Sequence, residues 1–298
     1  MSVPSSHGFR AAVAGIALAL AALAAAPLRA ASPPQRPGAQ PVYVWKDPDG
    51  KPLPFQSDEE IIEFLRTAEI ESVRDIELGV TGPRRVTLQQ GGVRMRAALR
   101  DYDETYVERR FDGIFYARLR DSYVFDIPAY ELARLLDIKV PPVTLRRVAG
   151  EQISLQAWVE GAMMESERIT EDIEPPSAIA FRRETQDMRV FDSVVGNVDR
   201  NTGNILYDDN FDIWLIDHSR AFMRNDETRY LPRVTGCSRQ IYERLQTLTY
   251  EQLEPLLSPP LTDSEVRWVL RRRDKVIAHI DALIAERGEG AVLFESGQ

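Results

Sequence analysis

The chain has 298 residues, of which 44% are hydrophobic and 28% charged, and its 37 basic and 46 acidic side chains leave a net charge of −9. This hydrophobic content suffices for a sizeable core and excludes a disordered chain, while the acidic balance argues against a nucleic-acid-binding surface. The single cysteine, Cys237, excludes a disulfide framework and a cysteine-based zinc site, and three histidines are too few for a His-rich metal site.

The first 31 residues have the pattern of an export signal. Arg10 supplies a positive charge, an apolar run of mostly Ala and Leu follows, and small residues surround Ala30. We therefore expect a signal peptide over residues 1–31 and an exported mature protein, periplasmic or extracellular, without a transmembrane segment. The alternative is an uncleaved membrane anchor, although an Ala-rich run of this length is only marginally able to span a bilayer.

After a Pro-rich linker expected over residues 32–41, residues 42–160 predict a small α+β lobe. Ser57 and Glu60 form a capping box at the start of an amphipathic helix. Alternating apolar residues on both sides of Gly91-Gly92 predict an antiparallel hairpin. A second helix and two further strands are then predicted over residues 125–136, 140–145 and 153–159.

Residues 161–298 predict a mainly helical lobe. Apolar spacing indicates a helix over residues 178–195, and two short strands flank a polar turn between residues 205 and 216. Helices over residues 238–247 and 263–287 follow. The fold expected from this order is a two-lobed α+β protein, with a small antiparallel sheet and one main helix followed by a helical lobe.

Three polar residues of the expected C-terminal lobe are the candidates for catalysis and metal binding. Asp199 precedes Asn204 by five positions, and Asp217 lies thirteen positions further on, after a predicted hairpin. Phosphoryl transfer needs a carboxylate to orient the attacking hydroxyl and hard oxygen ligands for Mg²⁺, and this spacing is typical of kinases. The alternative is that Asp199 and Asn204 form turns and Asp217 caps a helix.

The stretch from Asp199 to Leu206, DRNTGNIL, together with Ile216-Asp217-His, resembles the catalytic loop and metal motif of phosphatidylinositol 3-/4-kinase-like and HipA-like bacterial kinases. These kinases have the protein-kinase-like fold, and the resemblance extends over residues 75–294. It implies an ATP- and Mg²⁺-dependent phosphotransferase. Asp199 and Arg200 would be its catalytic-loop residues, with Arg200 stabilising the loop, and Asn204 and Asp217 would bind the metal.

By the same resemblance, Gly79 and Gly82 would lie in a phosphate-covering loop, an ordinary hairpin turn being the alternative. Arg100 stands where the family has a phosphate-binding Lys, a change that keeps the charge but replaces a compact ammonium with a planar fork. Asp126 aligns best with the helix carboxylate that pairs with this cation, and Glu131 is the fallback. An exposed strand charge is the alternative for Arg100.

Other polar and aromatic residues have expected places as well. Trp158 and Val159 would line the adenine pocket at the interlobe hinge, a plain core tryptophan being the alternative. His218 is expected to be partly buried and hydrogen-bonded. The remaining charged runs are expected to be solvated: residues 271–273, all arginine, on a helix face, and Asp208, Asp209 and Asp212 in a hairpin turn rather than a Ca²⁺ loop.

Three functions are consistent with this sequence. The first is a kinase that transfers the γ-phosphate of ATP to an unidentified hydroxyl on a protein, lipid or small molecule. The second is a nucleotide-binding pseudokinase, because Arg100 replaces the usual Lys and because ATP is scarce outside the cytoplasm. The third is a hydrolase or structural envelope protein whose aspartates bind Ca²⁺.

Overall fold

The computed structural model describes residues 43–76, 84–111 and 113–295. The expected signal peptide, the expected linker, Gly79 and Gly82 all lie outside these residues. Within the described ranges, no helix combines the length and the apolar character that crossing a membrane requires.

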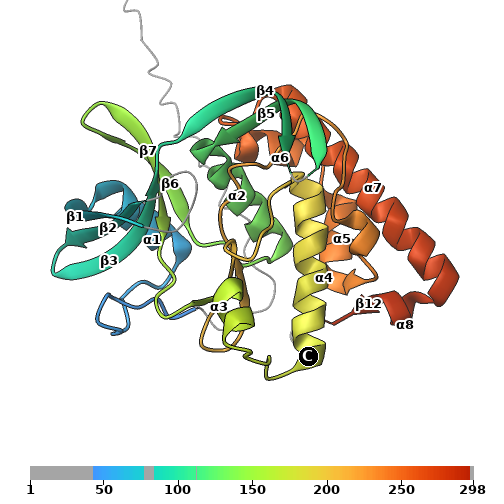
Figure 1. The fold of residues 1–298 in the computed structure, drawn as a ribbon, viewed down its shortest axis with the longest axis horizontal. Coiled ribbons are helices and arrows are strands. Elements are labelled where there is room, and N and C mark those ends of the chain that lie inside the picture. Colours follow the sequence, from blue (N-terminus) through green and yellow to red (C-terminus); the bar gives the residue numbers. More distant parts are fainter. Residues whose placement is uncertain (1–42, 77–83, 112, 296–298) are drawn as a thin grey trace, which may run out of the picture. The chain divides into compact units, whose positions relative to one another are not determined.

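The protein belongs to the α+β class, with an antiparallel sheet in the N-terminal part and helices in the C-terminal part, as predicted (Figure 1). The strands are β1 Glu69–Asp75, β2 Arg84–Gln90, β3 Val93–Arg100, β4 Asp103–Phe111, β5 Ile114–Ser122, β6 Val143–Val148, β7 Glu151–Ala157, β8 Met163–Met164, β9 Ile205–Tyr207, β10 Ile213–Leu215, β11 Cys237–Ser238 and β12 Leu293–Phe294. The α-helices are α1 Asp58–Thr67, α2 Asp126–Leu136, α3 Glu165–Thr170, α4 Ala178–Val195, α5 Arg239–Thr247, α6 Tyr250–Leu257, α7 Asp263–Arg287 and α8 Glu289–Val292. Two 3-10 turns span Tyr123–Phe125 and Leu231–Arg233.

The largest sheet has the strand order β1-β2-β3-β7-β6, and every neighbouring pair is antiparallel. Gly91 and Gly92 make the predicted β2–β3 turn with φ of +58° and +81°, values that glycine adopts without strain. One face of the sheet packs against α1 through residues that we call the sheet cluster. Its members include Ile61, Phe64, Leu65, Val86, Leu88, Met95, Ala97, Leu155 and Val159, together with Trp45, Leu206 and Trp214.

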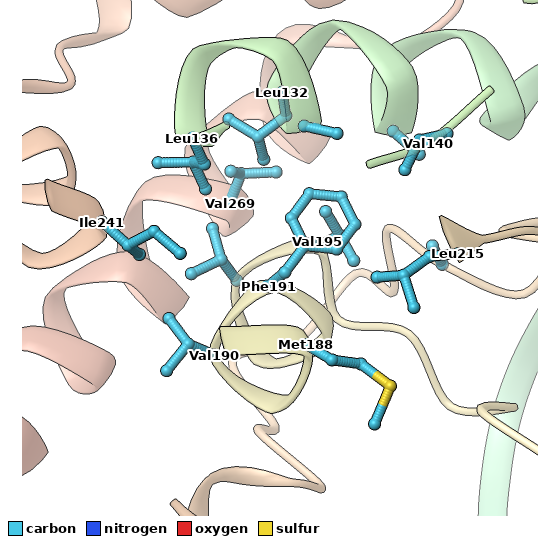
Figure 2. Close-up of a cluster of buried hydrophobic side chains, with 14 of the residues drawn as sticks. Leu132, Leu136, Val140, Met188, Val190, Phe191, Val195, Leu215, Ile241 and Val269 are labelled. Carbon is cyan, nitrogen blue, oxygen red and sulfur yellow. The ribbon is translucent and has the colours of Figure 1, made fainter. Parts of the chain in front are cut away.

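Helix α2 connects the sheet to the helices, since it contacts β6 as well as α4, α5 and α6. Figure 2 shows its Leu132 and Leu136 directed toward Phe191 and Val195 of α4, with Val269 of α7 beside them. These side chains are all buried. The helical core therefore holds α2, and with it Asp126 at the first turn of α2, in a defined place relative to β6.

A hairpin of β4 and β5 was not predicted from the sequence. Its strands pair from Asp103↔Ser122 to Phe111↔Ile114 and form a separate two-stranded sheet. Most β4 side chains are exposed, so the strand lacks the buried alternation by which strands are recognised. Tyr116 and Leu119 of β5 are buried and pack with Val198 and Met223, which places the hairpin against the residues around Asp199.

The β9–β10 hairpin was predicted, but its polar turn is less solvated than expected. Asp208 is buried, and its carboxylate accepts hydrogen bonds from the indole Nε1 of Trp214 at 2.9 Å and from the amides of Asn210 and Asp212. Asp209 forms an ion pair with Lys46, and Asp212 forms one with Lys139. The three carboxylates thus stabilise the turn through protein partners.

Arg272 corrects the expectation that residues 271–273 form a solvated helix face. Its side chain is completely buried, and its guanidinium donates to the carbonyl oxygens of Val194, Val195, Met223 and Asn225. Burial lowers the pKa of Arg272 to about 9, which still leaves it protonated at neutral pH. The cation thereby joins α7 to the C-terminal end of α4, where carbonyl groups lack partners within the helix.

We predict that Arg272→Leu lowers the free energy of unfolding by at least about 3 kcal/mol, because four carbonyl groups, three of them in buried contacts, lose their donor. Arg271→Leu is the matched control. Arg271 is exposed and stacks on Trp268 at 4.4 Å, so its loss costs less than about 1 kcal/mol. Urea denaturation of both variants measures the difference, and equal effects would contradict the assigned role of Arg272.

A partly buried carboxyl group, that of Asp187 in α4, links this helix to the start of α5. Its carboxylate accepts a hydrogen bond from the amide of Ser238 at 2.7 Å, and Ser238 is the N-cap of α5. Burial raises the pKa of Asp187 to about 7, and the Ser238 amide opposes this shift without cancelling it. The folded protein therefore binds this proton more tightly than the unfolded chain does.

A raised pKa in the folded state stabilises the protein in acid, and this contribution is lost as pH rises through 7. We predict that between pH 5 and pH 8 the wild type loses about 2 to 3 kcal/mol more stability than Asp187→Asn, which keeps an oxygen acceptor but does not titrate. Denaturant titrations at both pH values provide the measurement. If both proteins lost the same amount of stability between these pH values, Asp187 would not be the group responsible.

Candidate active site

The loop that follows α4 carries the first of the predicted catalytic residues. Helix α4 ends at Gly196, whose φ of +64° lets the chain turn sharply toward Asp199. The amide of Asp199 donates to Oδ1 of Asn197 at 3.0 Å, and the amide of Gly203 donates to Oδ1 of Asn201 at 2.8 Å. These side-chain turns fix the loop backbone without regular secondary structure.

Arg200 lies beneath this loop and is 2% exposed. Its Nε and Nη2 donate to the two carboxylate oxygens of Asp192 in α4, each at 2.9 Å. Its Nη1 donates to the carbonyl oxygens of Asn204 and Ile216 at 2.6 and 2.8 Å. Arg200 was predicted as a catalytic-loop residue that stabilises the loop. In the structure it lies inside the protein, where its hydrogen bonds connect α4, the loop and the residue that follows β10.

His218 lies next to this guanidinium and is completely buried, more so than the partly buried position that the sequence predicted. Nη2 of Arg200 is 2.9 Å from Nε2 of His218, and because an arginine can only donate, this nitrogen must be the acceptor. Burial, together with the charges of Arg200 and Arg100, holds the pKa of His218 well below its usual range. The imidazole is therefore neutral at physiological pH.

The Asp199 carboxylate is oriented from both sides. Nδ2 of Asn201 donates to Oδ1 at 3.1 Å, and Nη1 of Arg220 donates to Oδ2 at 2.8 Å. Burial raises the pKa of Asp199, the Asp217 charge adds to this, and Asn201 and Arg220 oppose it. A carboxylate held in this way keeps lone pairs that can accept a proton from a bound hydroxyl.

Asn204 and Asp217 lie at the same end of the β9–β10 hairpin, where the amide of Ile216 donates to the Asn204 carbonyl oxygen at 3.3 Å. Nδ2 of Asn204 donates to the carbonyl oxygen of Asp199 at 3.0 Å. Asp217 has a φ of +57°, a strained conformation for a non-glycine residue that is often found at functional sites. Burial alone would raise its pKa, but the charges of Arg100 and Arg200 and hydrogen bonds from Ser219 together outweigh burial and lower it.

This donor set fits a magnesium ion. Mg²⁺ prefers oxygen ligands and is commonly held by one or two protein groups together with substrate phosphates. Asp217 offers an ionised carboxylate. Asn204 uses its side-chain nitrogen Nδ2 to donate to Asp199, so its side-chain oxygen is the atom that it offers to a metal ion. Among the described residues, no three His, Cys, Asp or Glu side chains gather as a metal cage.

The predicted pairing of Arg100 with Asp126 is present in the structure. Nη1 of Arg100 donates to Oδ2 of Asp126 at 3.0 Å and to Oε1 of Gln156 at 3.2 Å. The other carboxylate oxygen of Asp126 accepts the amide of His218 at 2.9 Å. Burial alone would lower the pKa of Arg100, but the charges of Asp126 and Asp217 outweigh it and raise the pKa. Arg100 is thus a buried cation beside Asp217 and not an exposed strand charge.

Trp158 and Val159 follow directly after β7. The amide of Trp158 donates to the carbonyl oxygen of Arg96 at 3.1 Å, and the guanidinium of Arg85 lies 5.5 Å from the centre of its ring. Val159 is buried within the sheet cluster. The amide of Trp158 is therefore already used by β3, and Val159 contributes to the core.

Sequence reasoning missed three residues that complete the site: Asp192, Arg220 and Asp121. Asp192 and Asp121 are 1% and 0% exposed, so each is a buried carboxylate that requires a partner. For Asp192 a signal existed, since it interrupts the apolar C-terminal part of a predicted helix. The contact of Arg220 with Asp121 spans 99 residues of sequence and involves the unpredicted hairpin, so no local pattern indicates it.

No protein-family model matches this sequence, and no curated protein matches it either. Among solved structures, the chain is similar to hydra Fam20 determined with sugar, with a TM-score of 0.64 and 14% identity over 82% of this chain and 95% of that one. It is also similar to the Golgi casein kinase, with a TM-score of 0.59 and 14% identity over 81% of this chain and 80% of that one.

A further structure of the Golgi casein kinase, with Mn and ADP bound, has a TM-score of 0.59 and 15% identity over the same shares of the two chains. At such low identity these similarities establish the fold alone. The chain accordingly has a protein-kinase-like fold, as the sequence predicted.

Proposed function

We propose that this protein is an atypical kinase that transfers the γ-phosphate of ATP to a hydroxyl group in the presence of Mg²⁺. The observation that carries the proposal is the convergence of Asp199, Asn204 and Asp217 at one end of the β9–β10 hairpin, beside the Arg100–Asp126 pair. The kinase-like fold supports it, and so does the nucleotide and divalent metal found in the Golgi casein kinase structure.

Each of these residues has a distinct role in the proposal. Asp199 orients the acceptor hydroxyl and takes its proton, since its carboxylate is fixed by Asn201 and Arg220. Asn204 and Asp217 hold Mg²⁺, which when bound neutralises phosphate charge. Arg100 binds phosphate oxygens of the nucleotide, while Asp126 fixes its position. Trp158 and Val159 border the adenine, while the expected part of Gly79 and Gly82 in phosphate binding concerns residues outside the described ranges.

The acceptor is a hydroxyl of a protein, a lipid or a small molecule, and the chain acts after export. Its DRNTGN motif also resembles that of the phosphatidylinositol 3-/4-kinase-like and HipA-like enzymes, and we propose a relation to them on this motif. Residues 42–160 would form the nucleotide-covering lobe and residues 161–298 the catalytic lobe, with the nucleotide bound between them.

A nucleotide-binding pseudokinase is the second candidate, and the replacement of the usual Lys by Arg100 favours it. Both hydrogen bonds of Arg100 within the described residues come from Nη1. A planar fork can hold Asp126 with one nitrogen and a phosphate oxygen with another, so this replacement is compatible with nucleotide binding in both candidates. Turnover, not binding, separates them.

Purified protein tests the site through its thermal stability. Mg-ATP at a hundred times its Kd stabilises a folded protein by about 2.7 kcal/mol, which raises Tm by several degrees in a chain of this size. We expect Asp217→Ala to abolish this shift, because the metal ligand is lost. Asp209→Ala is the control, since this carboxylate lies in the exposed turn and pairs with Lys46.

Asp199→Ala completes the same experiment. Phosphate transfer from labelled ATP to a panel of acceptors, with water included as the simplest, should fall by about a hundredfold or more in this variant while the thermal shift persists. If the wild-type protein binds Mg-ATP but transfers no phosphate, it is a pseudokinase. No thermal shift with any nucleotide would refute both candidates.

The pair of Arg100 and Asp126 generates a separate prediction. A longer cation facing a shorter carboxylate spans roughly the same distance as a Lys facing a Glu, so the double variant Arg100→Lys with Asp126→Glu should retain Mg-ATP binding within about tenfold. Either single change misplaces the cation and leaves a mismatched buried pair, and it should weaken binding more than the double change does. Isothermal titration with Mg-ATP gives the three affinities, and additive losses would show that the residues act separately.

A further inference from the structure

Arg220 lies between the Asp199 loop and the β4–β5 hairpin and contacts both. Its Nη1 donates to Oδ2 of Asp199 at 2.8 Å, and its Nε donates to Oδ2 of Asp121 in β5 at 2.7 Å. Its guanidinium also stacks 4.7 Å from the ring centre of Phe111, which ends β4. The side chain is only 16% exposed, so these contacts fix it in one place.

The backbone on both sides of Arg220 is attached to the same elements. The amide of Val198 donates to the carbonyl oxygen of Arg220 at 3.3 Å, and the amide of Ser122 donates to the carbonyl oxygen of Ser219 at 2.9 Å. One connection reaches the residue before Asp199, and the other reaches the end of β5. Arg220 is thus held to the loop and to the hairpin by main chain as well as by side chain.

Asp121 has the features of an anchor for this arginine. Its side chain is completely buried, where a carboxylate without a cationic partner would be costly. The hairpin that carries it packs on Val198 and Met223 through Tyr116 and Leu119. Because β5 is held against the loop by this apolar contact, Asp121 offers a rigid support on which Arg220 can rest.

We propose that Arg220 is a positioning residue for Asp199. We further propose that the β4–β5 hairpin helps to position the active site, because its residues Asp121 and Phe111 hold Arg220. Arg220 occupies one lone-pair direction of Oδ2 of Asp199 and so determines which lone pairs face the acceptor hydroxyl. This inference rests on the proposed phosphotransferase activity for its chemical consequence, but the tether itself is independent of that activity.

The first test is the kinetics of Arg220→Met, with ATP as donor and water or the best acceptor of the panel. We expect kcat to fall about tenfold to a hundredfold, while KM for ATP and the Mg-ATP thermal shift stay within about twofold of wild type. Arg220→Lys restores the charge without the fork and should recover part of the loss. Arg118→Met, an exposed arginine on the same hairpin, is the control and should leave kcat unchanged.

A double-mutant cycle tests the part assigned to Asp121. If Asp121 acts through Arg220, Asp121→Asn lowers kcat in the wild-type background and has no further effect in the Arg220→Met background. An equal loss in both backgrounds would overturn the role of Asp121. A wild-type kcat in Arg220→Met, or no recovery in Arg220→Lys, would overturn the role of Arg220.

Hydrogen exchange gives a readout that does not depend on activity. Amides of residues 198–204 should exchange several-fold faster in Arg220→Met and in Asp121→Asn than in wild type, while those of α7 are unchanged. If the wild type neither binds Mg-ATP nor transfers phosphate, the proposed function fails but faster exchange still supports the tether. If these amides exchange at the wild-type rate in both variants, the tether is refuted whatever the activity.

Discussion

The buried guanidinium of Arg200 is the interaction on which the rest of the site depends. A cation removed from water must have its charge and its donors matched, and here Asp192, two backbone carbonyl oxygens and His218 provide this match. These partners come from α4, from the loop after Asp199 and from the end of β10. Because one rigid planar group satisfies all of them together, the loop that carries Asp199 and the hairpin that precedes Asp217 cannot shift independently of α4.

The same arrangement recurs around the site. Arg100 joins β3 to Asp126 of α2, and Arg220 joins Asp199 to Asp121 of β5. Buried ion pairs add little net stability compared with apolar packing, yet breaking one of them is costly, so they specify an arrangement more than they stabilise it. We infer that the carboxylates of Asp126 and Asp199 are held in place by arginines whose second contact lies on a neighbouring element.

Local patterns in the sequence were enough to predict the α+β class and most helices, and they also singled out Asp199, Asn204 and Asp217 as candidate site residues, since each depends on spacing along a short stretch. Contacts between distant segments were harder to predict, as with Asp121 and Arg220 across the hairpin. Arg272 is an intermediate case. Val269 and Val276 place it on the buried face of α7 by helical periodicity, but its neighbours Arg271 and Arg273 made the run look solvated.

The replacement of the usual Lys by Arg100 affects which atoms are available to bind the phosphates of a nucleotide. A lysine ammonium is a single point charge, so the carboxylate that positions it and the phosphate that it binds must share one nitrogen. In this protein Nη1 faces both Asp126 and Gln156, and among the described residues Nε and Nη2 make no further hydrogen bond. The fork therefore separates the anchored nitrogen from those free to meet a phosphate. Asp126 also accepts a hydrogen bond from the amide of His218, so this one carboxylate ties the anchored nitrogen of Arg100 to the backbone directly after Asp217. In the proposed function, the same carboxylate would therefore place both the phosphate-binding cation and the metal ligand.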